Sequence, residues 1–350
     1  MFVFSISSRT YGVPEPEIDS PVMILLTGAS GLLGQHVLNY LLKKNLPVRA
    51  LCRQLPVEFI SENLRSEPEW RTGDILDFSF LDEAFQGITH VYHCAGLVSY
   101  QPGDRDKLLQ VNAQGTKFIV DLCLHYQVRK LCFVSSIAAI GDSKEVGAVS
   151  EDDVWDPANN LSSYALSKRE AEMEVWRGMA EGLNAVILNP GIILGEGKLS
   201  SSSNRLFELA MKEFPWYSTG VTAFVDVNDV VQAMVKLMDQ QEITGRYIIA
   251  ENNYAFREIM DMMADAFHCH RATRKAKRWQ SALLWRWQWL VSKLSGRSPV
   301  LTKESVFNAF SVKYFDNSSL LHVLPGFTYQ PVRETIQRIA HYHLSKLNRG

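Results

Sequence analysis

The sequence predicts an α/β protein built on a doubly wound parallel sheet. Short apolar runs alternate with helix-like segments between residue 22 and about residue 195, which is typical of repeated β-α-β units. The runs are apolar throughout, as expected for parallel strands that helices cover on both faces. A chain of 350 residues is long enough for such a unit and a second, smaller region.

The expected elements follow one another in a regular order. The pattern predicts strands at residues 22–27, 47–52, 88–94, 130–136 and 184–190, and helices at 32–43, 107–126 and about 162–180. After Gly195 the rhythm changes, and the remaining chain is predicted to be mostly helical. Residues 1–21 contain three prolines and no periodicity, so we interpret them as a loose N-terminal extension.

The first strand leads directly into a glycine-rich turn, TGASGLLG, at residues 27–34. Glycines at this spacing between a strand and a helix predict a Rossmann dinucleotide site, in which the helix N-terminus attracts the pyrophosphate. Gly28 permits the tight turn, Gly31 lets the backbone approach the phosphates and Gly34 lets the helix pack on the strand. The residues expected to line the pyrophosphate are Gly28, Ser30, Gly31, Leu32, Leu33 and Gly34.

The end of the second strand predicts the cofactor. A carboxylate there binds the ribose of NAD, whereas an arginine suits the 2′-phosphate of NADP. This chain has Cys52 and Arg53, and a guanidinium can bind phosphate through two hydrogen bonds. We therefore expect NADP(H) to be preferred, with NAD(H) as the alternative.

These features divide the chain into regions. We expect the dinucleotide-binding domain at residues 22–195 and a substrate-binding region at 196–350, of which about 222–250 returns to the first domain.

The glycine turn, together with a later serine and a Tyr-x-x-x-Lys pattern, resembles the extended short-chain dehydrogenase/reductase superfamily. Four Tyr-x-x-x-Lys matches occur, beginning at Tyr40, Tyr126, Tyr164 and Tyr342. The resemblance requires the tyrosine on the helix that follows the serine-bearing strand, and among the four matches this selects Tyr164 with Lys168. The family pattern assigns the catalytic serine to Ser136, with Ser135 as the alternative.

The resemblance implies a catalytic role for these side chains. Tyr164 is expected to act as general acid or base, and Ser136 to hydrogen-bond the substrate oxygen. Tyr164 and Lys168 lie one helical turn apart, so the ammonium is expected to lower the pKa of the tyrosine. Lys168 is also expected to hold the nicotinamide ribose.

Further segments match the family in order. The resemblance places Asp74 and Ile75 beside the adenine, residues 94–96 under the cofactor and Asn112 where it orders the catalytic site. The segment NPGIILG resembles an RPGxxxG loop beside the nicotinamide, with asparagine in place of the usual arginine. The cofactor-binding residues implied in these segments are Asp74, Ile75, Cys94, Ala95, Gly96, Tyr164, Lys168, Asn189, Pro190, Gly191 and Ile192.

Charged residues that other subclasses of this superfamily carry are absent from this chain, and their absence indicates its subclass. Sugar-nucleotide dehydratases carry Asp and Glu after the catalytic hydroxyl residue, where this chain has Ile137 and Ala138, which cannot transfer protons. Epimerases carry an Arg-Asp-aromatic triplet where this chain has residues 222–224, Thr-Ala-Phe, so a phosphate clamp is absent. The segments SPVLTKESV and LPGFTYQPV resemble dihydroflavonol-reductase-like and 3β-hydroxysteroid-dehydrogenase-like members.

We therefore expect an NADP(H)-dependent oxidoreductase that interconverts a ketone and a secondary alcohol on a fairly apolar small molecule. The alternatives are a sugar-nucleotide epimerase that retains NAD and a non-catalytic, NADP-responsive binding protein. The resemblance implies a homodimer.

Composition bears on compartment and partners. The five cysteines are far apart and form no CxxC pair, which favours a cytoplasmic protein. The His-Cys-His cluster at residues 268–270 has no second group of ligands at a suitable spacing, so no metal site is expected. No apolar run reaches 18 residues, so no spanning helix is expected.

A basic, tryptophan-rich segment stands out near the C-terminus. Residues 266–303 contain nine Lys or Arg and no Asp or Glu, so the remaining residues carry −11 against a net charge of −2. Apolar residues recur at helical spacing through residues 278–294. This segment is interpreted as a cover over the core or substrate pocket or, alternatively, as a helix that gives the protein peripheral membrane contact; nucleic-acid binding is not expected. The recurring apolar residues are Trp279, Leu283, Trp287, Leu290, Val291 and Leu294.

Overall fold

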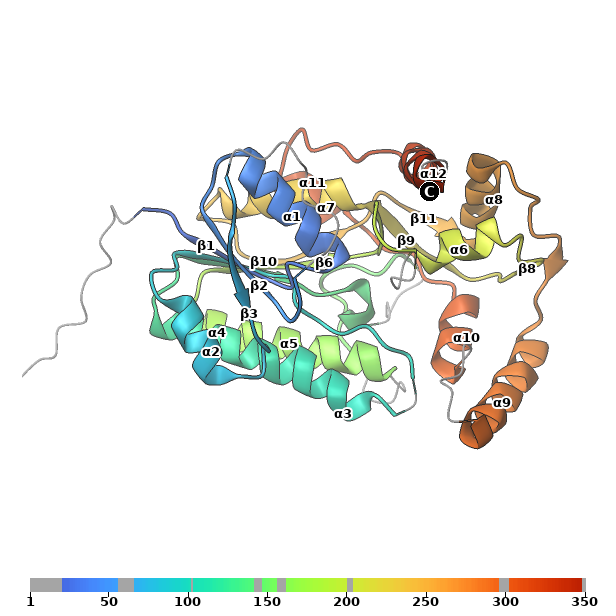
Figure 1. The fold of residues 1–350 in the computed structure, drawn as a ribbon, viewed down its shortest axis with the longest axis horizontal. Helices are drawn as coiled ribbons and strands as arrows, with labels where there is room; N and C mark the ends of the chain where they lie inside the picture. Colours follow the sequence, from blue (N-terminus) through green and yellow to red (C-terminus); the bar gives the residue numbers. More distant parts are fainter. Residues whose placement is uncertain are drawn as a thin grey trace, which may run out of the picture.

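The computed structural model describes residues 21–55, 66–101, 103–141, 147–155, 162–199, 204–295 and 302–347. The interpretation of residues 1–20 as a loose extension therefore lies outside the described residues. Within the described chain, seven parallel strands form one sheet (Figure 1). Their order is β10 (Gly245–Ile249), β6 (Ala185–Pro190), β5 (Lys130–Val134), β4 (His90–His93), β1 (Ile24–Thr27), β2 (Val48–Cys52) and β3 (Glu69–Thr72).

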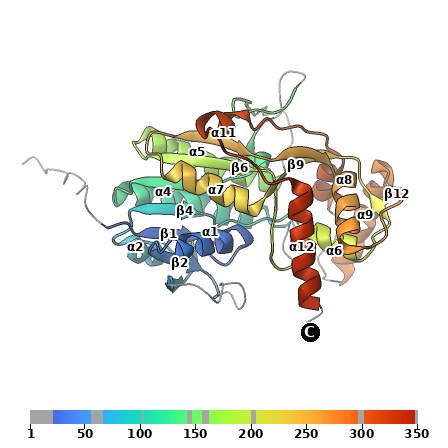
Figure 2. The same cartoon turned by 90° about the horizontal axis from the view of Figure 1, so that it is seen from above.

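Helices cover both faces of this sheet, as Figures 1 and 2 show. One face carries α1 (Leu32–Lys43), α7 (Val227–Met238) and α11 (Ser318–Val323). The other face carries α2 (Phe78–Phe85), α4 (Gly115–His125) and α5 (Ser163–Ala180). The chain order changes direction between β1 and β4, which are neighbours in the sheet. The predicted doubly wound fold is confirmed, and ligands of such folds bind at this switch point.

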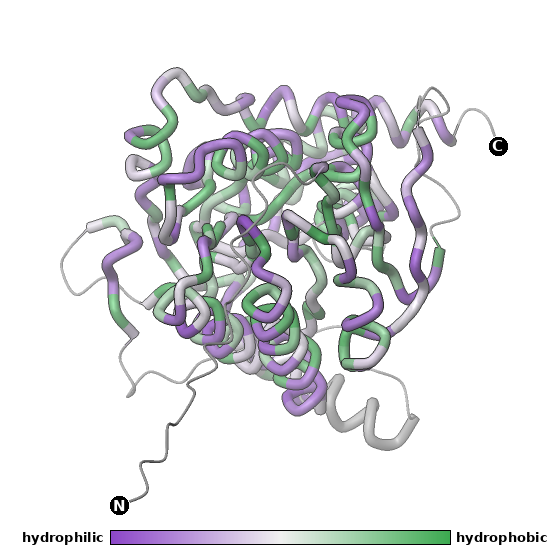
Figure 3. The backbone as a smooth tube through the Cα atoms, turned by 90° about the vertical axis from the view of Figure 1, so that its left-hand side faces the viewer, coloured by the Kyte–Doolittle hydropathy of each residue, from purple (hydrophilic) through white to green (hydrophobic). Residues whose placement is uncertain are grey.

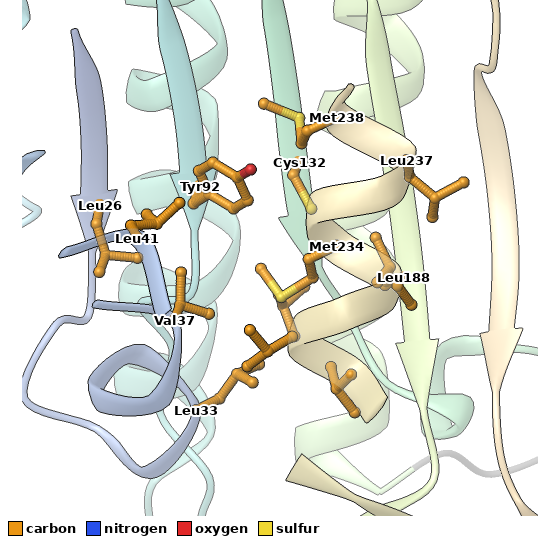
Figure 4. Packing of buried hydrophobic residues seen from close by; sticks show 14 of the residues in the cluster. Leu26, Leu33, Val37, Leu41, Tyr92, Cys132, Leu188, Met234, Leu237 and Met238 are labelled. Carbon is orange, nitrogen blue, oxygen red and sulfur yellow. The ribbon is translucent and has the colours of Figure 1, made fainter. Parts of the chain in front are cut away.

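Two cores result because alternate side chains of each buried strand point to opposite faces. Figure 4 shows the first core, where Leu33, Val37 and Leu41 of α1 lie on the side of Met234 of α7, and Leu237 lies on the opposite side of α7. The second core lies between the sheet and α2, α4 and α5. In Figure 3 apolar and polar segments alternate along the covering helices, as expected for helices with one buried face.

Most strands lie within one or two residues of their expected positions. Helix α1 spans the predicted residues, and α5 begins at Ser163 because the Ser162 side chain accepts a hydrogen bond from the amide of Ala165. The structure also contains β3 and α2, which the sequence did not predict. β3 is short and carries charged residues, since it forms the edge of the sheet.

The helix expected at 107–126 differs from the prediction. It consists of α3 (Arg105–Leu108), a π-helical stretch η1 (Leu109–Gln114) and α4 in direct succession. A π-helical stretch inside an α-helix is rare and occurs mostly at functional sites. Here it contains Asn112, which the sequence singles out.

The later chain forms a second body beside the sheet. It was expected to be mostly helical, but its described residues also form two small sheets, which complete the packing around the helices. Its core joins Phe224 to residues of α6, α8 and α12. The strands are β7 (Ile192–Leu194), β9 (Val221–Asp226) and β11 (Asn252–Ala255), with β8 (Trp216–Tyr217) paired to β12 (Arg274–Lys275); the helices are α6 (Arg205–Met211), α8 (Phe256–Phe267), α9 (Arg278–Ser295), α10 (Lys303–Phe310) and α12 (Val332–Leu347).

The two bodies are interleaved along the chain. Residues of α7 pack on the first core, and β10 pairs with β6 at the edge of the main sheet. Asp226 caps α7 by accepting a hydrogen bond from the amide of Asn228. Within the described residues, no helix combines the length and the apolar character needed to cross a membrane.

Candidate active site

The glycine turn between β1 and α1 allows very close backbone contacts. Gly28 has a φ of +69°, and a Cβ there would lie 2.6 Å from the backbone nitrogen of Ala95. A Cβ on Gly34 would lie 2.1 Å from the carbonyl oxygen of Gly28, so the helix packs against the turn without room for any side chain. Gly31 is less confined, since its Cβ would lie 3.3 Å from that oxygen. Two of the three glycines are therefore sterically required.

The first turn of α1 is arranged to receive an anion. Gly31 is the N-cap and offers no side-chain acceptor, so the amides of the first turn, including Leu32 and Leu33, need an acceptor from elsewhere. Ser30 precedes the cap, and its carbonyl accepts a hydrogen bond from the Gln35 side chain. The cradle that a Cβ would fill, together with these amides, fits the pyrophosphate of a dinucleotide.

The ends of β2 and β3 lie next to this turn. The amide of Ala29 donates to the carbonyl of Leu51, and the amide of Gly73 to that of Cys52. Arg53 follows β2 directly and is exposed, which puts a guanidinium at the position where dinucleotide sites recognise the ribose. On the next loop, Asp74 accepts a hydrogen bond from the amide of Leu76.

The neighbouring residue Ile75 connects this loop to the helix that carries Asn112. Its side chain lies 3.3 Å from the position that a Cβ on Gly115 would take. Asp74 and Ile75 thus line the same edge of the sheet as the glycine turn, where the sequence expects the adenine.

Tyr164 and Ser136 lie together at the carboxyl end of β5. Ser136 follows β5 and caps the short helix η2 (Ile137–Ala139), and a hydrogen bond joins its side chain to Tyr164. Tyr164 is buried in the first turn of α5, and the ring of Tyr100 meets it edge-on at 5.9 Å. The alternative, Ser135, has a buried hydroxyl without a hydrogen-bond partner. The geometry thus favours Ser136 over Ser135.

Lys168 lies one turn after Tyr164 on the buried side of α5. Its ammonium donates a 2.8 Å hydrogen bond to the carbonyl of Val134 and lies 5.1 Å from the ring centroid of Phe133. It is also close to the cofactor turn, because a Cβ on Gly96 would lie 3.3 Å from Nζ. The lysine therefore connects the end of β5 with the loop after β4.

Burial has the largest effect on the pKa values of Tyr164 and Lys168. It raises the pKa of Tyr164, assisted by Tyr100, while the hydrogen bond from Ser136 opposes the rise. Burial lowers the pKa of Lys168 to about 8, while Glu172 and Cys94 act to raise it. This differs from the expectation that the ammonium would lower the pKa of the tyrosine, because burial of the phenol has the largest effect on that pKa. Tyr164 is accordingly a protonated phenol at neutral pH.

Asn112 fixes the loop after β4. Its side-chain amide donates to the carbonyl of Leu97 at 3.0 Å and to the hydroxyl of Ser167 at 2.8 Å, and its oxygen accepts from the amide of Leu97 at 2.7 Å. Since Ser167 precedes Lys168, these bonds connect the π-helical stretch, the loop and α5. Ala95 and Gly96 belong to the same loop. Burial raises the pKa of the neighbouring Cys94 thiol to about 12.

Asn189 is fully buried and faces the serine loop rather than open solvent. Its side-chain amide donates to the carbonyl of Ser136 at 2.8 Å and to Glu172 at 2.5 Å. Glu172 is itself buried and pairs with Arg246 of β10 at 3.2 Å. The asparagine that stands where the sequence comparison expects an arginine thus connects β6 to Ser136. Arg246 supplies a guanidinium to the same carboxylate from the neighbouring strand.

The residues after Asn189 belong to the turn between β6 and β7. Pro190 ends β6, and the amide of Gly191 donates to the carbonyl of Ile249. A Cβ on Gly191 would lie 2.6 Å from the carbonyl oxygen of Ala223, so the turn packs directly on β9. Ile192 begins β7 on the other side of this contact.

His93 is a buried residue at the site that sequence reasoning missed. Its ring nitrogens lie 2.7 Å from the Thr27 hydroxyl and 3.0 Å from the Thr116 hydroxyl, which in turn donates to the carbonyl of Asn112. Burial and the charge of Lys168 lower its pKa to about 3, so the ring is neutral. The chain of bonds joins the glycine turn to Asn112. Its signal is a buried histidine at the end of β4, directly before CAG.

A second missed residue is Glu304 in α10. Its carboxylate accepts hydrogen bonds from the amide and the hydroxyl of Ser163, at 3.1 and 3.2 Å. Ser163 directly precedes Tyr164, so α10 holds the start of α5. No sequence pattern indicates this contact, because the two residues are 141 positions apart.

The Tyr-x-x-x-Lys pair formed by Tyr126 and Lys130 makes hydrogen bonds that support the fold. Lys130 is fully buried and donates hydrogen bonds to the carbonyls of Leu237 and Ile243. Tyr126 donates to Asp82 on the far side of the domain from the glycine turn. Among the four pairs, the one that begins at Tyr164 is next to a serine at the carboxyl edge of the sheet.

A model of the NAD dependent epimerase/dehydratase family matches residues 24–250 of this chain. The match extends from β1 through β10 and thus includes the glycine turn, Ser136, Tyr164 and Asn189.

The curated relatives that resemble this chain include two reductases and a protein named for sterol demethylation. Cinnamoyl-CoA reductase 2 of Arabidopsis thaliana is 25% identical over 70% of this chain and 77% of its own length. Sterol demethylase protein B of Methylococcus capsulatus is 28% identical over 69% and 73%. A putative dihydroflavonol 4-reductase of Synechocystis is 24% identical over 91% and 93%.

Solved structures share the fold along nearly the whole chain. The crystal structure of gox2253 superposes with a TM-score of 0.76 at 22% identity, covering 92% of this chain and 98% of that one. MoeE5 in complex with UDP-glucose and NAD superposes with a TM-score of 0.73 at 21% identity, covering 93% and 99%. At this identity the likeness concerns the fold alone.

Proposed function

This chain belongs to the NAD dependent epimerase/dehydratase family, within the extended short-chain dehydrogenase/reductases, and we propose that it is an NADP(H)-dependent oxidoreductase that reduces a ketone on a fairly apolar small molecule. Such a family binds a nicotinamide cofactor. The observation that supports the proposal most directly is the buried Tyr164, hydrogen-bonded to Ser136 and one turn from Lys168 at the cofactor edge of the sheet.

The residues of this chain handle the proton. Tyr164, protonated at neutral pH because burial raises its pKa, donates the proton of its hydroxyl to the substrate oxygen as the carbonyl becomes an alcohol. Ser136 hydrogen-bonds the same oxygen and positions it against Tyr164. Lys168 stabilises the negative charge that remains on the phenolate oxygen. When bound, the nicotinamide cofactor supplies the hydride. In the reverse reaction the deprotonated Tyr164 accepts the proton of the alcohol.

Missing groups support a reductase over other activities of the family. At the positions where dehydratases use an acid and a base, Ile137 and Ala138 begin η2, and Ile137 is buried among apolar residues. On β9, Ala223 and Phe224 are fully buried, where epimerases present a charged triplet. Curated relatives include a reductase and a protein named for sterol demethylation, and the sterol in the second name agrees with an apolar substrate.

We propose that the protein prefers NADP(H) because of one residue at the end of β2. Arg53 is exposed directly after β2, and no carboxylate stands at that strand end. Its guanidinium can form charge-assisted hydrogen bonds to a 2′-phosphate.

Turnover with a panel of ketones and alcohols tests the proposal, with NADPH and NADH compared for each substrate. We expect NADPH-dependent reduction of at least one apolar ketone and loss of that turnover in Tyr164→Phe. Absence of turnover with every carbonyl, while NADPH still binds, would favour a non-catalytic NADP-responsive binding protein.

A sugar-nucleotide epimerase that retains NAD is the second candidate. It is motivated by the fold shared with MoeE5, whose structure holds UDP-glucose and NAD. Calorimetric titration with UDP-glucose, together with the spectrum of cofactor released on denaturation, distinguishes the two. Tight UDP-glucose binding and co-purified NAD would support the epimerase.

A further inference from the structure

Helix α9 (Arg278–Ser295) exposes large apolar side chains. Trp279, Leu283 and Trp287 are 61%, 59% and 64% exposed, and their spacing of four residues puts them along one face of the helix. The side chains of Leu290, Val291 and Leu294, which the sequence adds to this stripe, lie outside the described residues. A row of tryptophan and leucine that stays exposed among the described residues is unusual on a protein surface and marks a site of interaction.

The exposed stripe continues on the neighbouring helix. α10 packs against α9, and its Phe307 is 54% exposed with the guanidinium of Arg278 5.9 Å from its ring centroid. On α9, the guanidinium of Arg286 lies 4.8 Å from the ring centroid of Trp285. Apolar and cationic groups are thus interleaved over both helices, which we call the α9–α10 face. Figure 1 shows these helices at one end of the molecule, away from the main sheet.

The segment that contains α9 is strongly basic, whereas α10 also carries Glu304, whose carboxylate accepts hydrogen bonds from Ser163. Residues 266–303 contain nine Lys or Arg and no Asp or Glu, although the whole chain has a net charge of −2. Such a segment attracts an anionic surface and repels other basic ones. Tryptophan among Lys and Arg is the composition found where helices lie at the headgroup level of a bilayer.

We propose that the α9–α10 face docks the protein onto an anionic lipid surface. α9 lies in the plane of the interface, with Trp279, Leu283 and Trp287 inserted between headgroups and the basic residues against anionic lipids. A second copy of the chain is a poorer occupant, because two such basic faces repel each other. A negatively charged protein is also poorer, because the protruding aromatic row would lack a matching groove.

The docked face is connected to the catalytic helix. Glu304 of α10 binds the amide and hydroxyl of Ser163, the residue before Tyr164. The lipid surface would therefore lie beside the part of the molecule that holds the start of α5. If the proposed reduction of an apolar ketone holds, this arrangement lets the enzyme take its substrate from the membrane; the docking itself does not depend on that function.

Co-sedimentation with vesicles tests the docking on the full chain. The probes are vesicles of phosphatidylcholine with about 30% phosphatidylserine, and vesicles of phosphatidylcholine alone, at low and high salt. We expect most of the protein to pellet with the anionic vesicles at low salt, and about a tenfold weaker affinity at high salt because salt screens the basic residues. The tryptophan emission should shift to the blue on binding.

Two variants locate the contact. Trp279→Ala with Trp287→Ala should weaken binding at least about fivefold, and Lys275→Gln with Lys277→Gln and Arg278→Gln should reduce the salt dependence. Phe78→Ala with Met173→Ala, which removes two exposed apolar side chains elsewhere, is the matched control and should bind as the unmodified protein does. Thermal melting and NADPH binding check that each variant is folded.

Three outcomes would overturn the docking. Unmodified protein that stays in the supernatant at low salt shows that the face does not bind lipid. Equal pelleting of the tryptophan variant places the contact elsewhere. A tryptophan variant that changes the oligomeric state in size-exclusion chromatography without any change in pelleting shows that the face joins copies of the chain instead.

Discussion

The side-chain amide of Asn189 lies 2.8 Å from the backbone carbonyl oxygen of Ser136 and donates a hydrogen bond to it. The end of β6 therefore fixes the backbone of Ser136, whose side chain contacts Tyr164. The same amide donates to Glu172, and Glu172 acts to raise the pKa of Lys168. One buried asparagine thus affects both the serine and the lysine of the site.

Replacing Asn189 by Ala should lower activity more than cofactor binding. The change removes one donor from the Ser136 carbonyl, which keeps the amide of Ala139, and one from the buried Glu172, which keeps Arg246. The loss of these two bonds costs about 1–3 kcal/mol of unfolding free energy. Denaturant titration, kcat and the dissociation constant of NADPH measure the three effects. Asn184→Ala is the control, because its amide donates to a carbonyl at the surface. Unchanged kcat in Asn189→Ala would show that the serine loop does not need this bond.

Replacing Tyr164 by Phe should remove turnover and leave NADPH binding nearly intact. The phenyl ring keeps the packing against Tyr100 but has no proton to donate, and such acid catalysis contributes about 10²–10⁴-fold. Steady-state turnover and a fluorescence titration with NADPH test this. Tyr126→Phe, which loses only its bond to Asp82, should remain active; equal losses in both variants would refute the assignment.

Replacing Glu172 by Gln should move the alkaline limb of the reduction rate to lower pH. The Glu172 carboxylate favours the ammonium form of Lys168, whose pKa is about 8, so a neutral amide lowers that pKa further. Lys168 then loses its charge at a lower pH than in the unmodified enzyme. The pH dependence of kcat is the measurement. Glu174→Gln, whose carboxylate pairs with Arg177 at the surface, should leave the limb in place, and an unmoved limb in Glu172→Gln would contradict the coupling.

Replacing Arg53 by Asp should weaken NADPH binding by about 1.5–3 kcal/mol and spare NADH. The guanidinium of Arg53 is expected to bind the 2′-phosphate through charge-assisted hydrogen bonds, which NADH does not need. Dissociation constants for both cofactors test this, with Arg333→Asp on α12 as an exposed control. Equal affinity of the unmodified protein for both cofactors would contradict the preference.

Patterns that repeat along the chain were sufficient to predict the fold. The glycines at 28, 31 and 34 follow an apolar strand, and the resulting sheet has the predicted parallel form. Tyr164 and Lys168 share a face because they lie on one helix, which is a local property. The edge strand β3 was missed because charged, half-exposed residues carry no apolar pattern.

The sequence by itself determined the parallel sheet, the glycine turn and the spacing of the tyrosine and lysine, because each depends on residues within one or two elements. The tertiary structure alone decided what surrounds them: the bond from Asn189 to Ser136, the pairing of Glu172 with Arg246 and the contact of Glu304 with Ser163. It also decided that the pKa of Tyr164 is raised, since desolvation depends on everything that packs around a side chain. These contacts join residues far apart in the chain, and no local pattern carries that information.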